Sequence, residues 1–329
     1  MKVLYVTGKS ADYVQDLTYS GLVKVLGLKN VIDYPWNQKF HIPYKKYPRN
    51  LGYTKFSLVP SLLNRSYKDV DMVIVGASKV DCFQSYLEIM DDIPSNIPTV
   101  FIDGGDQPGI GDDIGKAYHA PELYEKVINK RAFDYIFKRE YPIDADYGDN
   151  VFPFPISFNL DRAPKVSEDY KYDVSFWGVE SWPIRTQALE ILEDKFDCRS
   201  NGTVRNQVFS KYKRKGTFYL EELSRCKIVL NFRGGGWDTM RYWEIPAVQT
   251  LQLSQKPQIK IPDNFEHEKS IIFCQDDLSD LTHLCEYYLK NETQREKIAV
   301  AGYNHLKEFH TDVARAKYLL QKVTDTWNK

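Results

Sequence analysis

Short apolar segments rich in β-branched residues alternate with longer segments of helical spacing along most of this chain. Such alternation is typical of parallel sheets, because each helix carries the chain back across the sheet before the next strand begins. The first run of expected strands covers residues 2–7, 31–34, 72–75, 99–103 and 135–138. The second run covers residues 173–177, 227–231, 251–253 and 270–273. The pattern predicts an α/β fold with two doubly wound, Rossmann-like domains.

The two runs are separated by residues 148–171, which contain Pro153, Pro155 and Pro164 and show little periodicity. This segment predicts a domain boundary, with one domain over residues 1–160 and the other over 161–329. The last predicted helix, at 311–327, is a candidate to cross back into the first domain. Open α/β sheets bind ligands beyond the carboxyl ends of their strands. Two such domains facing each other would form a cleft for a donor and an acceptor.

Composition excludes several classes of protein. The chain has 44 Lys and Arg against 45 Asp and Glu, a net charge of −1, so a general nucleic-acid binder is disfavoured. Its five cysteines form no CxxC pair, which argues against a disulfide framework or a zinc cluster. No apolar run approaches the ~18–20 residues of a membrane span. We expect a cytoplasmic globular protein without a transmembrane segment.

The segment richest in binding features covers residues 231–244, which follow a predicted strand and lead into a predicted helix. Gly234, Gly235 and Gly236 allow a ligand to approach the backbone N–H groups. Arg241 and Glu244 are three residues apart, so they share one face of that helix. An arginine suits phosphates and a glutamate suits hydroxyls, so the segment predicts a sugar-nucleotide site. The alternative is an ordinary loop with a surface ion pair.

The second half resembles group 1 glycosyltransferases of the GT-B type, and within them the branch typified by the spore-maturation protein CgeB. Three blocks carry the resemblance. They are residues 172–178 followed by Arg185, residues 226–253, and residues 295–315. Together they span about residues 172–320, whereas the first half is similar only in its strand–helix pattern.

The resemblance implies that the second domain binds a nucleotide-sugar donor and the first binds the acceptor. Arg185 and Arg241 would contact the donor diphosphate, together with Gly178 and the three glycines at 234–236. Glu244 is similar to the first glutamate of the family's E-x7-E pattern, which meets donor hydroxyls. The second position is Gln252, a neutral group that can still hydrogen-bond a ribose.

Two further sequence features bear on the donor site. Where the family usually has a glycine, this chain has Gln249, which puts close packing of the helix against a ligand in question. The basic run at residues 211–215 could add phosphate contacts, although charge runs are usually solvated surface. The expected co-substrate is a nucleotide-sugar, UDP- or GDP-linked, with no separate cofactor.

Asp103 and Asp106 follow a predicted strand of the first half, where an acceptor would bind. An acceptor hydroxyl that attacks an anomeric carbon needs a base within hydrogen-bond reach, and Asp103, Asp106 or His119 could serve. The alternative is an Asp-Gly turn with no catalytic role. A retaining enzyme would need no such base.

We expect no metal. Asp144 and Asp146 match the short DxD pattern of metal-dependent transferases, but such a pattern arises easily by chance. His305 and His310 lie five residues apart, which puts them off a common helical face.

The predicted function is transfer of a sugar from a nucleotide-sugar to an acceptor hydroxyl of a glycan, a small molecule or a protein. Three alternatives stay open at this point. One is a sugar-nucleotide epimerase-like enzyme, which would need no acceptor. Another is a sugar-nucleotide-binding module without turnover. The third is a transferase that modifies hydroxymethylated DNA bases.

Overall fold

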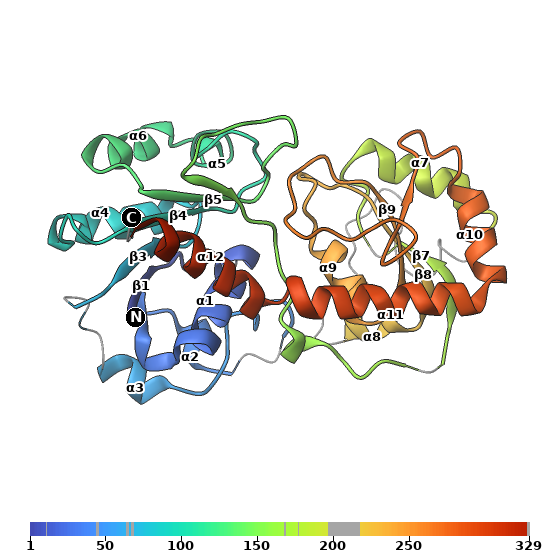
Figure 1. Ribbon diagram of the computed structural model, residues 1–329, viewed down its shortest axis with the longest axis horizontal. Helices are drawn as coiled ribbons and strands as arrows, with labels where there is room; N and C mark the ends of the chain where they lie inside the picture. The colour runs from blue at the N-terminus through green and yellow to red at the C-terminus, as the bar shows by residue number, and fades with distance from the viewer. Residues whose placement is uncertain are drawn as a thin grey trace. The chain divides into compact units, whose positions relative to one another are not determined.

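The computed structural model describes residues 1–10, 12–43, 46–63, 66, 69–167, 169–176, 178–196 and 218–327. The chain forms two compact units. The first unit comprises Met1–Asn159, Ile259–Pro262 and Thr311–Lys329. The second comprises Leu160–Gln258 and Asp263–His310. The break after Asn159 falls in the proline-containing segment, and the last helix belongs to the first unit (Figure 1).

The first unit is built on a parallel sheet whose described strands lie in the order β2-β1-β3-β4-β5-β6. These strands are β1 (Val3–Val6), β2 (Val31–Tyr34), β3 (Met72–Val75), β4 (Thr99–Asp103), β5 (Tyr135–Lys138) and β6 (Val151–Pro153). Its helices are α1 (Tyr13–Leu26), α2 (Gln38–His41), α3 (Leu58–Leu63), α4 (Val80–Ile89), α5 (Asp112–Lys116), α6 (Pro121–Lys130) and α12 (Asp312–Trp327). All five strands expected in this half are present.

Alternate residues of this sheet face different helices, as the two-residue period of a strand requires. Leu4, Val6 and Val75 belong to one core cluster with Phe83 of α4 and Val127 of α6. On the other face, the Tyr5 hydroxyl donates to the carbonyl oxygen of Gln15 in α1 at 2.8 Å. Helices α1 and α12 pack side by side (Figure 1).

Strand β6 was not expected, because Pro153 and Pro155 made this segment read as a linker. The strand pairs only with β5 among the described strands, so it forms the sheet edge. An edge strand tolerates a proline because one side of its backbone needs no partner.

The second unit contains a parallel sheet whose described strands lie in the order β10-β9-β8-β7. They are β7 (Tyr172–Ser175), β8 (Cys226–Asn231), β9 (Leu251–Gln255) and β10 (Ile272–Cys274). The helices are α7 (Pro183–Leu192), α8 (Phe218–Ser224), α9 (Met240–Ala247), α10 (Leu281–Lys290) and α11 (Glu292–Phe309). Leu230 and Leu253 pack with Leu189 of α7 and Cys285 of α10 in one core cluster. Helix α8 was not expected.

Candidate functional site

The carboxyl edge of the second sheet is formed by the residues that follow β7 and β8. After β8 the chain turns tightly, and the Gly234 N–H donates to the Gly236 carbonyl oxygen at 2.9 Å. The Thr239 hydroxyl then donates to Asn231 Oδ1 at 2.7 Å, which ties the start of α9 to the end of β8. The predicted strand, glycine turn and helix are therefore present in that order.

Arg185, in the first turn of α7, joins the loops after β7 and β8. Its Nε donates to the Arg233 carbonyl at 2.8 Å and its Nη2 to the Phe232 carbonyl at 2.9 Å. Its Nη1 donates to the Val179 carbonyl and the Ser181 hydroxyl at 2.8 and 3.0 Å. Among the described residues no carboxylate pairs with Arg185, which is 5% exposed. Burial, and then the charge of Arg241, lower the pKa of Arg185 to about 9.

Arg241, in the first turn of α9, lies beside Arg185. The Arg241 guanidinium carbon is 4.8 Å from the centre of the Phe176 ring, and that of Arg185 is 5.5 Å from the same centre. A Cβ atom at Gly178 would overlap the Arg241 guanidinium, so a glycine is required for this approach. Arg241 is 7% exposed. Two buried positive charges on one ring repel each other, and an anion such as a diphosphate would relieve that repulsion.

Glu244 follows one turn after Arg241 in α9 and is fully buried. The Tyr219 hydroxyl of α8 donates to its Oε2 at 3.0 Å. Gln252 lies elsewhere, as the second residue of β9, where it pairs in register with Val229 of β8. Gln252 lies three residues before the end of its strand, which is about 10 Å of strand length. This position does not favour the predicted contact between Gln252 and a donor ribose at the carboxyl edge.

Gln249 ends α9 rather than facing a ligand at its start. Its φ of +55° lies in the left-handed region. The Gln249 N–H donates to the Pro246 carbonyl at 3.0 Å, and the Thr250 N–H donates to the Ile245 carbonyl at 3.4 Å. This pair of bonds is a Schellman cap, which usually has glycine in the left-handed position. The departure from the family's glycine therefore concerns the cap of the helix.

Asp103, at the carboxyl edge of the first sheet, is a fully buried structural anion. Lys138 lies opposite it on β5, and its Nζ is 3.0 Å from Asp103 Oδ2. The Ser78 hydroxyl donates to Asp103 Oδ1 at 2.5 Å, and the Gly111 N–H donates to Oδ2 at 3.0 Å. A base must reach its acceptor, so this enclosure favours a positioning role for Asp103 over the predicted catalytic one.

Asp106 and His119 lie nearer the surface of the first unit. The Asp106 side chain is 51% exposed and forms an ion pair with Arg139, which follows β5. His119 is exposed, and its φ of +55° places it in the left-handed region after α5. The structure thus leaves these two as the accessible candidates of the predicted three.

The DxD pattern, the expected absence of a metal and the basic run are the remaining predictions. Asp146 Oδ1 accepts the Gly148 N–H at 3.0 Å within its own turn. Within the described ranges, no group of three or more His, Cys, Asp and Glu side chains is arranged to hold a metal ion. The basic run at 211–215 lies outside the described residues.

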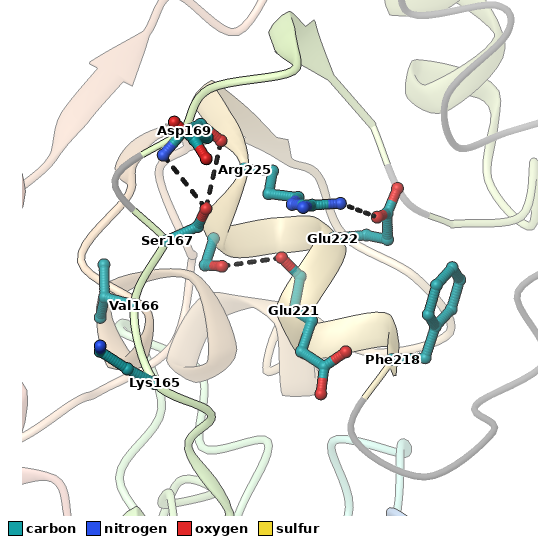
Figure 2. A pocket seen from close by; sticks show the side chains of 9 residues that line it. Lys165, Val166, Ser167, Asp169, Phe218, Glu221, Glu222 and Arg225 are labelled. Atoms are coloured by element: carbon teal, nitrogen blue, oxygen red, sulfur yellow. Dashed lines mark hydrogen bonds and ion pairs between the residues drawn. The ribbon is translucent and has the colours of Figure 1, made fainter.

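A pocket of about 460 Å³ opens at the other edge of the second sheet (Figure 2). It is lined by Lys165, Ser167 and Asp169, which precede β7, and by Glu222 and Arg225, which precede β8. Figure 2 shows Arg225 in contact with Glu222, and their Nη1 and Oε1 atoms are 3.4 Å apart. Because these segments precede the strands, the pocket lies at the amino edge, away from Arg185 and Arg241.

Residues 162–321 match a family model described as glycosyl transferase-like. The second half of the chain is therefore glycosyl transferase-like. No curated protein matches the sequence of the chain significantly.

Solved structures extend the likeness over both units of this glycosyltransferase. An alpha-glucosyltransferase in complex with UDP and DNA is 13% identical, with a TM-score of 0.62 over 99% of each chain. HepE from Anabaena, in complex with UDP-glucose, is 9% identical, with a TM-score of 0.61 over 99% of this chain and 100% of its own. TarM is 12% identical, with a TM-score of 0.51 over 80% of this chain and 55% of its own.

The solved structures confirm the predicted GT-B fold, and the family match confirms the prediction of a glycosyltransferase. They confirm neither the CgeB-like branch nor any site residue. Throughout the part of the glycosyltransferase that the structure describes, we find no helix long and apolar enough to span a membrane.

The sequence did not reveal two features of the site. One is Lys138 as the partner of Asp103, although both residues end neighbouring parallel strands and that position was a usable signal. The other is a stack of Trp182, Arg233 and Trp237 in the loops after β7 and β8. Aromatic residues beside an arginine in two such loops were visible in the sequence, but their stacking depends on how the loops fold.

Proposed function

We propose that this glycosyltransferase transfers a sugar from a UDP-sugar to an acceptor hydroxyl, with the donor diphosphate between Arg185 and Arg241. The buried guanidinium pair at the carboxyl edge of the second sheet carries the proposal. Arg185 has hydrogen bonds to carbonyl and hydroxyl groups but no acidic partner among the described residues. UDP in the alpha-glucosyltransferase and UDP-glucose in HepE support uracil as the base.

The proposed role of the two arginines depends on where negative charge develops during sugar transfer. As the sugar leaves, the diphosphate gains negative charge, and guanidiniums already fixed in place stabilise it without reorganisation. Glu244, one turn from Arg241, is as buried as Asp103 and accepts the Tyr219 hydroxyl, so we assign it to holding α9 against α8. Among group 1 glycosyltransferases, we assign the chain to the CgeB-like branch. The three sequence blocks within residues 172–320 that resemble this branch support the assignment.

On the acceptor side, we assign Asp106 as the base if the reaction inverts the anomeric carbon, with His119 as the second candidate. Asp106 lies three residues after β4, at the edge where an open α/β sheet binds ligands, and its carboxylate is half exposed. Asp103 holds the end of β4 in place through Lys138.

The first experiment measures UDP binding to the full chain by titration calorimetry. Arg241→Gln should weaken UDP binding by about 10- to 150-fold, because it removes a charged hydrogen bond worth ~1.5–3 kcal/mol. Arg225→Gln is the matched control, because Arg225 belongs to the same unit but lies at the opposite sheet edge. If the parent protein, Arg241→Gln and Arg225→Gln bind UDP with equal affinity, the assignment of the site is wrong.

Turnover then separates the candidate activities. A transferase consumes UDP-sugar in step with acceptor, whereas an epimerase-like enzyme needs no acceptor and a binding module yields no product. The acceptor panel should include glycans, small hydroxyl compounds and DNA with hydroxymethylated bases. Under inversion, Asp106→Asn should lower kcat by roughly 10²- to 10⁴-fold and leave UDP affinity unchanged.

A further inference from the structure

A stack of two tryptophans around an arginine lies next to the guanidinium pair. The Arg233 guanidinium carbon is 4.1 Å from the ring centre of Trp182 and 4.3 Å from that of Trp237. Trp237 is half-buried, but Trp182 is 39% exposed. A cation held this closely fixes one face of each indole, so the stack is rigid before any ligand arrives.

The backbone ties this stack to Arg185 from both sides. The Arg185 side chain donates to the carbonyl oxygen of Arg233, and its backbone N–H donates to the carbonyl oxygen of Trp182 at 3.0 Å. Trp182 caps the start of α7 and Arg185 lies in its first turn. A group that stacks on Trp182 would thus lie close to one that binds Arg185.

We propose that Trp182 is the stacking platform for the nucleobase of the donor, and that Arg233 and Trp237 hold it in place. The inference rests on the proposed function, since it takes the phosphate site at Arg185 and Arg241 as given. A nucleoside diphosphate joins its base to its phosphates through one ribose, so the two subsites must be neighbours. Trp182 is 39% exposed, so part of its indole is open to a ligand.

The electrostatics of the stack favour a base over a sugar ring. The negative charge density of the indole face attracts cations and also the positive C–H edges of a sugar. In Trp182 that density is already drawn toward the Arg233 guanidinium. Stacking of a planar base depends mainly on flat contact and is worth ~1–3 kcal/mol per base.

The test uses the full chain and three ligands, namely UDP, UDP-glucose and pyrophosphate. Trp182→Ala should weaken the binding of UDP and of UDP-glucose equally, by about 5- to 150-fold, and leave the binding of pyrophosphate unchanged. Trp182→Phe keeps a flat ring and should stay within a few-fold of the parent protein. Trp327→Ala is the matched control, because Trp327 is also 39% exposed but lies in α12 of the other unit.

Each other outcome overturns the inference in a distinguishable way. Weakening of UDP-glucose without UDP would make Trp182 a sugar platform. Equal weakening of pyrophosphate would show that Trp182 acts only by holding the phosphate loop. No change with Trp182→Ala, while Arg241→Gln still weakens UDP, would refute the base platform and leave the proposed function intact. If the parent protein binds no UDP, the proposed function itself fails.

Discussion

At the scale of single residues, Gln249 pays a conformational cost that a glycine would avoid. Its φ of +55° disfavours a residue with a Cβ atom by ~1–2 kcal/mol, and the greater flexibility of an unfolded glycine offsets part of that. Gln249→Gly should therefore raise the free energy of unfolding by about 0.5–1 kcal/mol, as measured by urea denaturation.

Gln249→Ala is the control, because alanine keeps the strained φ and should bring no such gain. UDP affinity should not change in either variant, since Gln249 caps the end of α9 and Arg241 lies in its first turn. A stability gain of equal size with alanine would contradict the backbone explanation.

At the scale of elements, the Asp103–Lys138 pair joins β4 to β5 inside the first sheet. Both side chains are fully buried, so removal of one charge leaves the other without its counterion. Lys138→Met should cost about 3–5 kcal/mol of unfolding free energy. Adding Asp103→Asn to it should recover part of that loss, because no net charge then stays buried. Chemical denaturation of the two single variants and the double variant measures this coupling.

Lys116→Met is the control for Lys138→Met, because it breaks an ion pair at the surface instead of a buried one. Lys116 Nζ lies 2.6 Å from Asp112 Oδ2, and its side chain is 60% exposed. Its loss should change stability by at most ~1 kcal/mol. If both lysine variants lose the same stability, burial does not set the strength of the Asp103 pair.

The same elements show how far the sequence could be read. Strand Met72–Val75, for example, was predicted to the residue, because it is a continuous apolar run of the kind that buried parallel strands show. The loop glycines and Arg241 were also predictable, because they lie close together in the sequence between a predicted strand and a predicted helix. The enclosure of Asp103 and the stacking of Trp182 on Arg233 were not, because each joins segments that are far apart in sequence.

At the scale of the whole molecule, the chain ends in the unit where it began. Asp312, at the start of α12, lies 2.8 Å from Lys24 Nζ and accepts the Ser20 hydroxyl at 2.7 Å. Between them, Gly21 of α1 lies against the backbone of α12. A Cβ atom there would overlap the Asp312 carbonyl oxygen and come within 2.9 Å of the Ala316 Cβ atom. The absence of a side chain at Gly21 is thus what allows the two helices to pack.

Gly21→Ala tests this packing through the sign of its effect. Within a helix, replacing glycine with alanine ordinarily stabilises by about 0.5–1 kcal/mol. Here α12 would have to move, so we expect a loss of about 1–3 kcal/mol. In Gly115→Ala the new Cβ atom would lie 3.3 Å from the Pro121 Cβ atom, a tight contact that offsets the ordinary helical gain, so that control should stay within ~0.5 kcal/mol. Faster hydrogen exchange in both α1 and α12 of Gly21→Ala would assign the loss to this contact. A stabilised variant would mean that α12 does not pack on α1 in solution.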